Sequence, residues 1–182
     1  MVNRKMDIFH MTTAWILAQN SSCCSKKVGA ILVNDNRILS SGYNGTRKGV
    51  KNCGDHAKEM GWSINGINLS SENRSFHREW SMKNEYHAEQ NALDNASRLG
   101  IPIKDCSLFV TISPCIECCK RISNVGINRL VYSEEYDFSD NEWKKFLEDS
   151  GVLVERITLK ELGNAQDFLN VENLKYDMVV RW

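Results

Sequence analysis

The stretch "CSLFVTISPCIECCKRIS", residues 106–123, decides the fold. Residues 106–112 are a short apolar run with β-branched and aromatic side chains, which predicts a buried strand. Ser113 stands where a helix N-cap belongs, and Pro114 suits the first helical position. The remainder, "CIECCKRIS", continues as a helix. A strand that leads directly into a helix is the repeating unit of an α/β sheet.

The segments around this unit repeat the same alternation. Helices are expected at about residues 7–19, with Asp7 as the cap, 85–98 and 141–150. Strands are expected at 28–33, 37–43, 128–133 and 152–157, the first two as a hairpin around "NDN". This order predicts an α/β protein with three layers, α/β/α, and a mixed sheet of about five strands. The helix near Asn141 should make the last two strands parallel, because parallel neighbours need a crossover.

The chain of 182 residues is expected to form one domain, residues 1–182. An insertion at about residues 45–84 is polar, rich in Gly and Asn and weakly periodic, with a short helix near His56–Met60. Segments of this length without regular structure are usually functional. The C-terminal tail, about residues 158–182, has no clear pattern.

Charge and composition exclude several classes of protein. Lys and Arg number 23, as do Asp and Glu, so a broad nucleic-acid-binding surface is not expected. No signal peptide and no membrane-spanning run is recognisable, which predicts a cytoplasmic protein without membrane partners. The seven cysteines then favour metal ligation or free buried thiols over a disulfide framework.

A metal site is predicted from His87, Cys115 and Cys118. The two cysteines are three residues apart in the first turn of a helix, so their sulfurs share one face. The positive end of the helix lowers thiol pKa values and favours thiolates that bind zinc. Three protein ligands leave the fourth zinc position for water, which is the arrangement of a catalytic site. Cys119 offers a competing sulfur; Cys118 is preferred and Cys119 is assigned to the core.

Glu89 lies two residues after His87 and is predicted to reach the metal-bound water without being a ligand. A structural zinc, a redox pair or chance would explain a lone "CxxC". The combination H-x-E…P-C-x-x-C is instead typical of zinc-dependent nucleobase deaminases. The pattern predicts hydrolytic attack at C4 of a cytosine-type ring, with Glu89 moving a proton to N3.

The segments "VGAILV", "SGYNG", "NEYHAEQNAL", "TISPCIECCKRI" and "LVYSEEYD" resemble the deoxycytidylate (dCMP) deaminases, most closely the phage type, over about residues 10–157. The resemblance implies conversion of dCMP to dUMP, which feeds thymidylate synthesis. It also implies an oligomer, with a hexamer favoured, that dCTP activates and dTTP inhibits together with Mg²⁺. A phage-encoded member would act in the host cytoplasm.

The resemblance also implies roles for single residues. Asn44 should hold the deoxyribose, and Tyr136 should close over the sugar and phosphate. Arg98 should lie near the nucleotide and the subunit contact. The base pocket should be lined by Thr111, Ile112, Ser113 and Pro114, and regulatory nucleotides should bind near Gly42, Tyr43 and Gly45.

Blander interpretations stand beside these roles. Asn44 would serve equally as a turn residue, Tyr136 as a loop aromatic, and Arg98 as a cation at a helix C-terminus. Lys26 and Lys27 are more easily explained as solvated surface than as phosphate partners.

A second, structural zinc is implied by the resemblance, with Cys23, Cys53, His77 and Glu85 as ligands. An insertion with little apolar content needs an anchor, and metal binding supplies folding free energy directly. Cys24 competes with Cys23, and His56 competes with His77. Buried thiols and a surface histidine remain the alternative.

Other functions stay open at this stage. They are a dCTP or bifunctional dCMP/dCTP deaminase, a cytidine deaminase, a tRNA adenosine deaminase and a zinc-held binding module without catalysis. Neutral charge disfavours tRNA. Glu89 disfavours the module, because a purely structural site has no use for a neighbouring carboxylate.

Overall fold

The computed structural model describes residues 3–136 and 142–163. Its main sheet has five strands in the order β2-β1-β5-β6-β7. Strand β1 is antiparallel to β2 and β5, whereas β5, β6 and β7 run parallel. The strands are β1 (Gly29–Asn34), β2 (Arg37–Tyr43), β5 (Ser107–Ile112), β6 (Arg129–Glu134) and β7 (Leu153–Arg156). The predicted mixed five-stranded sheet with parallel last strands is confirmed.

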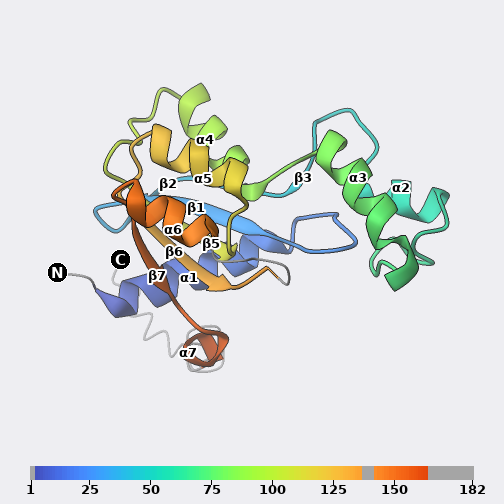
Figure 1. Cartoon of the computed structure of the whole chain (residues 1–182), viewed down its shortest axis with the longest axis horizontal. Helices are drawn as coiled ribbons and strands as arrows, with labels where there is room; N and C mark the ends of the chain where they lie inside the picture. Colours follow the sequence, from blue (N-terminus) through green and yellow to red (C-terminus); the bar gives the residue numbers. More distant parts are fainter. Residues whose placement is uncertain (1–2, 137–141, 164–182) are drawn as a thin grey trace, which may run out of the picture.

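Helices cover both faces of this sheet (Figure 1). On one face lies α1 (Arg4–Ala18), with the short α7 (Leu159–Gly163) beside it. The other face carries α4 (Ala88–Arg98), α5 (Ile116–Asn124) and α6 (Glu142–Asp149). Phe109 packs under α1, while its neighbours Leu108 and Val110 pack under the other three helices. The apolar run in β5 is continuous because both of its faces are buried.

The hairpin between β1 and β2 closes through Asp35 and Asn36. Both have positive φ values, 47° and 61°. Asp and Asn tolerate this left-handed conformation, and a two-residue turn of this kind matches the twist of the flanking strands. The predicted "NDN" turn is therefore present.

Helix α1 begins earlier than predicted. Its N-cap is Asn3, whose side chain accepts a hydrogen bond from the Met6 amide. Asp7 is not the cap but lies buried inside the first turn. Its two carboxylate oxygens accept hydrogen bonds from Arg129 on β6, at 2.9 and 2.7 Å. The sequence pattern near Asp7 suggested a cap because this partner 122 residues away cannot be seen locally.

Helix α5 begins later than predicted. Its N-cap is Cys115, and Ser113 is still part of the extended chain. The Ser113 amide donates to the Glu134 carbonyl at 2.7 Å, and its hydroxyl accepts from the Tyr136 amide at 2.9 Å. Pairing with the end of β6 therefore keeps Ser113 extended and delays the helix by two residues.

Residues between β2 and α4 form a separate lobe, which projects from one end of the sheet (Figure 1). It contains α2 (Cys53–Glu59), a 3₁₀ turn (Ser71–Asn73) and α3 (Arg74–Asn84). Strands β3 (Gly45–Thr46) and β4 (Glu85–Tyr86) pair with each other and form its neck. We call residues 45–86 the lobe and the remainder the body. Helix α3 was not predicted, because His77 is its one buried residue and the segment shows no apolar stripe.

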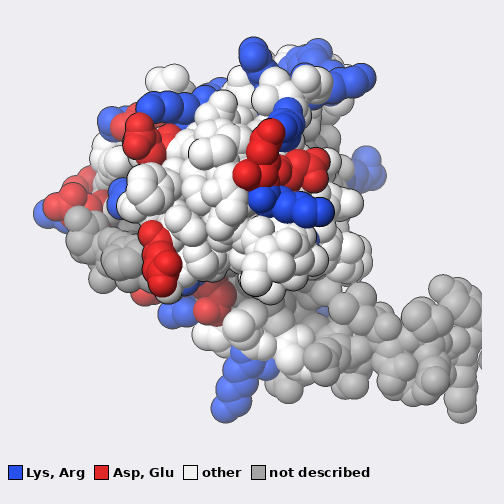
Figure 2. Space-filling view, turned by 90° about the vertical axis from the view of Figure 1, so that its right-hand side faces the viewer, with Lys and Arg blue, Asp and Glu red and all other residues white. Residues whose placement is uncertain are grey.

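Surface properties agree with the composition. On the face drawn in Figure 2, acidic and basic side chains are interspersed rather than gathered into a broad basic area. Among the described residues, no helix is both long enough and apolar enough to cross a membrane. Of the predicted tail, residues 164–182 lie outside the described residues.

Candidate metal centres and active site

The first candidate centre joins the starts of two helices. His87 is the N-cap of α4, Cys115 is the N-cap of α5, and Cys118 lies in the first turn of α5. The His87 Nδ1 atom lies 3.4 Å from each cysteine sulfur, and the ligand atoms all lie within 4.8 Å of one another. A tetrahedral zinc with ordinary bond lengths separates such nitrogen and sulfur atoms by about 3.5 Å. The three residues fit a metal ion without rearrangement.

The protonation state of Cys115 supports this assignment. Hydrogen bonds with Cys118 and, to a smaller extent, with His87 lower the pKa of Cys115 to about 4, against the opposing effect of burial. The interaction with Cys115 raises the pKa of His87 to about 9. A thiolate is therefore already favoured at Cys115, and thiolates are the form that binds zinc.

Glu89 is buried beside this cluster, in the first turn of α4. Its side chain is 4% exposed. Burial raises its pKa, and the nearby His87 opposes that rise. Glu89 also interacts with Cys118, which places its carboxyl group at the cluster without making it a ligand. A carboxyl whose pKa is raised by burial accepts a proton more readily than an ordinary one and can act as an acid–base group.

Cys119 points away from the cluster. It is fully buried and packs in the core between the sheet, α4 and α5. Burial raises its pKa to about 12, so it remains a thiol. The geometry brings Cys118, not Cys119, to His87.

The predicted base-pocket residues are the last two of β5 and the two that follow it, immediately before Cys115. Thr111, Ile112, Ser113 and Pro114 are all buried. The Thr111 hydroxyl accepts a hydrogen bond from the Gly29 amide at 3.1 Å. This bond ties the end of β5 to the start of β1 and gives the segment a fixed backbone.

Asn44 and Tyr136 flank this segment. The Asn44 side chain accepts from the Val28 amide at 2.8 Å and donates to the Lys26 carbonyl at 2.9 Å. Tyr136 is 47% exposed, and the Lys26 ammonium lies 5.5 Å from the centre of its ring. Asn44 thus orders the loop that carries Lys26 next to Tyr136.

Arg98 does not approach the first centre within one chain. It lies at the C-terminal end of α4, exposed, and donates to Asn95 at 3.3 Å. Arg98 lies eleven positions after His87, which is about 16 Å along the helix axis.

Gly42, Tyr43 and Gly45 differ in their surroundings. A Cβ atom on Gly42 would lie 2.4 Å from the Ala92 amide nitrogen. Gly42 is therefore required by the close approach of β2 to α4. The Tyr43 carbonyl accepts from Asn91 at 2.7 Å, whereas Gly45 has open space around it and begins the neck.

The second candidate centre lies between the lobe and the body. The His77 Nε2 atom is 3.6 Å from the Cys23 sulfur and 3.2 Å from the Cys53 sulfur. Glu85 completes the group, and all four ligand atoms lie within 4.8 Å of one another. The Glu85 Oε1 atom is buried without a hydrogen-bond partner among the described residues, while the Glu85 Oε2 atom accepts from Ser81 at 2.6 Å. A metal ion would supply the missing partner, and two sulfurs, one nitrogen and one oxygen are acceptable zinc ligands.

The competing ligands lie outside this group. The Cys24 sulfur is 3.7 Å from the Cys53 sulfur, but the four-residue cluster contains Cys23 rather than Cys24. His56 stacks on Trp80 with ring centres 4.4 Å apart. His56 is thus a packing residue of the lobe.

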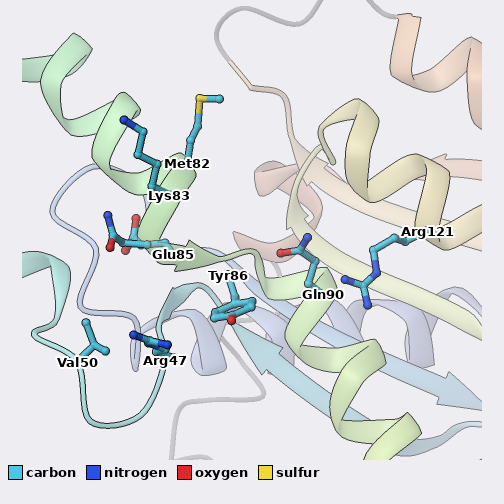
Figure 3. Close-up of a pocket in the computed structure, with 9 residues that line it drawn as sticks. Arg47, Val50, Met82, Lys83, Glu85, Tyr86, Gln90 and Arg121 are labelled. Atoms are coloured by element: carbon cyan, nitrogen blue, oxygen red, sulfur yellow. The ribbon is translucent and has the colours of Figure 1, made fainter.

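A cavity of about 450 Å³ lies between the neck, α3 and the body (Figure 3). Three cationic side chains line it, those of Arg47, Lys83 and Arg121, together with Tyr86 and Gln90. Lys83 pairs with Glu79 and Arg121 pairs with Asp94. Sequence reasoning missed this cavity, because its residues come from separate segments and form no motif.

Comparisons with known proteins agree with this geometry. Residues 4–134 match the family model of the cytidine and deoxycytidylate deaminase zinc-binding region. The deoxycytidylate deaminase of Enterobacteria phage T4 is 40% identical, over 88% of this chain and 92% of that protein. The human deoxycytidylate deaminase is 33% identical, over 72% of this chain and 67% of that protein. A crystal structure of dCMP deaminase from cyanophage S-TIM5, in complex with dCMP and dUMP, matches with a TM-score of 0.67 and 30% identity, covering 86% of this chain and all of that one.

Proposed function

Because the chain belongs to the family of cytidine and deoxycytidylate deaminases, which are zinc-binding hydrolytic enzymes, we propose that it converts dCMP and water to dUMP and ammonia. The observation that carries this proposal is the grouping of His87, Cys115 and Cys118 beside the buried Glu89. Three ligands leave one coordination position free for water, and an acid–base group stands next to it.

His87, Cys115 and Cys118 would hold a zinc ion, which supplies a bound water with a pKa near neutrality. Glu89 would take a proton from the attacking water and deliver it to N3 of the cytosine ring as the water oxygen bonds to C4. It would then take the second proton from the new C4 hydroxyl and pass it to the exocyclic amino group, so that the C4–N bond breaks and ammonia leaves. The burial of Glu89 is consistent with this role, because it raises the pKa of the carboxyl and so makes the proton-bound form easier to populate.

The substrate would lie against the end of β5. Thr111, Ile112, Ser113 and Pro114 form a rigid wall for the base, because their backbone is fixed by bonds to β1 and β6. Asn44 and Tyr136 would flank the sugar. We propose a deoxynucleoside monophosphate as the substrate because the S-TIM5 dCMP deaminase, which has a similar fold, was solved with dCMP and dUMP.

An ammonia-release assay tests the substrate assignment. The zinc-loaded protein is given dCMP, dCTP, deoxycytidine and CMP in parallel, and kcat/KM is measured for each. We expect dCMP to exceed deoxycytidine and CMP by at least about tenfold. A larger value for dCTP would make the protein a dCTP deaminase, and no release from any of the four would reject deamination of cytosine nucleotides.

We further propose that the enzyme is regulated by dCTP and dTTP with Mg²⁺, and supplies dUMP for thymidylate synthesis. The cavity beside the neck supports regulation: Arg47, Lys83 and Arg121 line it and could each pair with a phosphate, Lys83 and Arg121 in exchange for Glu79 and Asp94, while Tyr86 offers an aromatic face. A hexamer is the expected assembly. The position of Arg98 away from its own active site is consistent with a role at a subunit contact.

Substitution of Arg47 tests the regulatory site. The ratio of dCMP turnover with and without added dCTP is compared between the wild type, Arg47→Ala and Arg78→Ala, an exposed cation elsewhere on the lobe. We expect Arg47→Ala to lose most of the activation and Arg78→Ala to retain it. Equal activation in all three would move the regulator elsewhere. Light scattering of the same samples reports the assembly size.

A further inference from the structure

The two candidate metal centres are joined by one short strand. Glu85 belongs to the second centre and His87 to the first, and Tyr86 alone separates them. Glu85 and His87 both have extended backbone angles, φ −105° and ψ 140° for Glu85, φ −75° and ψ 156° for His87. Side chains two residues apart in an extended chain lie on the same side, about 7 Å from one another at Cα. Figure 3 shows Glu85 at the end of α3 and Gln90 at the start of α4, with Tyr86 between them.

The lobe has little else to hold this strand in place. Only three of its residues, Cys53, Ala57 and Trp62, belong to the small buried cluster there, and the other two members, Cys23 and Cys24, come from the body. The neck consists of two residue pairs, Gly45 with Tyr86 and Thr46 with Glu85, and such short ladders are marginal in water. The position of Glu85 therefore depends on its own contacts, which are the Ser81 hydroxyl and the second centre.

His87 is fixed on its other side by the body. Its amide donates to the Gln90 side chain at 3.0 Å, which caps α4. This bond fixes the backbone of His87 at the start of α4. The residues that precede His87 are positioned by strand β4. The orientation of the His87 side chain relative to Cys115 and Cys118 therefore depends on both α4 and Glu85.

We propose that Glu85 is a positioning residue for the catalytic histidine, so that metal binding at the second centre strengthens metal binding and turnover at the first. With a metal at the second centre, the Glu85 carboxylate is held and β4 is rigid. Without the metal ion, the Glu85 carboxylate loses its contact with the second centre and β4 becomes more mobile. The backbone of His87 is then fixed by α4 alone. The inference rests on the proposed function for its effect on turnover, but not for its effect on metal affinity.

Removal of a distant ligand of the second centre tests this coupling. His77→Gln empties that centre without touching β4, and Glu79→Gln, an exposed change on the same helix, serves as the control. We expect the zinc affinity of the first centre, measured by competition with a chromophoric chelator, to fall by about 10- to 100-fold, as when outer partners of metal ligands are lost. We expect kcat for dCMP to fall about tenfold, with KM within about twofold of the wild type. Glu79→Gln should match the wild type in all three values.

An empty second centre with an unchanged zinc affinity at the first would overturn the inference. If His77→Gln does not fold, Ser81→Ala decides, because it keeps all four ligands and removes only the hydrogen bond to Glu85. It should weaken zinc binding at both centres by several-fold, and unchanged binding at both would equally overturn the inference. If the wild type releases no ammonia from dCMP, the proposed function fails, and the chelator competition still answers the question of coupling.

Discussion

The two candidate metal centres use the same kinds of residue and differ in everything around them. The first has three ligands, an exposed cysteine at Cys115 and a buried acid, Glu89, beside it. The second has four ligands, with no further carboxyl group in the cluster. An incomplete ligand set with a neighbouring acid suits chemistry, whereas a complete set suits an anchor. Ligand type alone therefore does not separate a catalytic centre from a structural one.

The regions that carry the centres differ in the same sense. The body is stabilised by two apolar clusters on the two faces of the sheet. The cluster that joins the lobe to the body is much smaller, with Cys53, Ala57 and Trp62 from the lobe and Cys23 and Cys24 from the body. Burial of apolar surface stabilises the body, and we expect a metal ion at the second centre to stabilise the lobe.

The largest expected effect concerns the acid that distinguishes the first centre. Glu89→Gln should lower kcat for dCMP by about 10³-fold, because a positioned acid–base group contributes about 10²–10⁴-fold. Both zinc ions should remain, as measured by elemental analysis. Glu117→Gln, an exposed carboxylate on α5, is the control and should keep full activity. Appreciable turnover in Glu89→Gln would show that Glu89 does not transfer the proton. The neighbouring acid would then no longer distinguish the first centre from the second.

The next prediction compares the free energy of unfolding lost when a phenylalanine is removed from the core of the body and from the surface of the lobe. Phe109→Ala removes a side chain that is 1% exposed in the body and should lower the free energy of unfolding by about 3–5 kcal/mol. Phe76→Ala removes one that is 59% exposed on the lobe and should change it by less than about 0.5 kcal/mol. Urea denaturation measures both. A similar cost for the two would show that the lobe contributes to global stability as the body does.

A smaller effect distinguishes neighbouring thiols at the first centre. Cys118→Ala should weaken zinc binding there by more than about 100-fold, since even outer partners of ligands change affinity by about 10–100-fold. Cys119→Ala should leave zinc affinity unchanged, because Cys119 faces the core. Chelator competition provides the measurement. The reverse outcome would assign the ligand to Cys119.

The smallest expected effect concerns the body alone. His10 is buried on the inner face of α1, and within residues 3–136 and 142–163 neither of its ring nitrogens has a hydrogen-bond partner. Burial lowers its pKa below 6.5, with Arg129 acting in the same direction and Asp7 opposing. The unfolded chain therefore binds a proton at higher pH than the folded one, and stability falls as the pH drops below about 6.5.

His10→Leu should remove this acid sensitivity. Its unfolding free energy should exceed that of the wild type more at pH 5.5 than at pH 8, as followed by thermal or urea denaturation. An identical pH dependence in the two proteins would mean that His10 does not titrate on unfolding.

The sequence predicted the body well for physical reasons. Strands such as β5 are continuous apolar runs because they are buried on both faces, and the turn at Asp35 and Asn36 has its own local chemistry. Helix starts were less accurate: Asp7 and Ser113 are good caps in isolation, yet tertiary partners on β6 and beyond occupy them instead. A cap is a local signal that a distant partner can override.

The lobe and the cavity were harder to predict. The ligands of the first centre were predicted because His87, Cys115 and Cys118 stand at spacings typical of a zinc site, whereas those of the second centre were implied only by the resemblance to the phage-type deaminases. Helix α3 was missed because metal ligands and neighbouring rings, rather than an apolar stripe, bury His77. The cavity at Arg47, Lys83 and Arg121 assembles only when three separate segments meet.

The neck has a consequence for how this fold can vary. Thr46 and Glu85 are paired across it, so the chain leaves the body and returns at almost the same point. The number of residues between Thr46 and Glu85 therefore does not affect the geometry of the main sheet. A segment of another length or origin could therefore replace the lobe at the neck. The inserted segment would need contacts of its own that hold strand β4 in place.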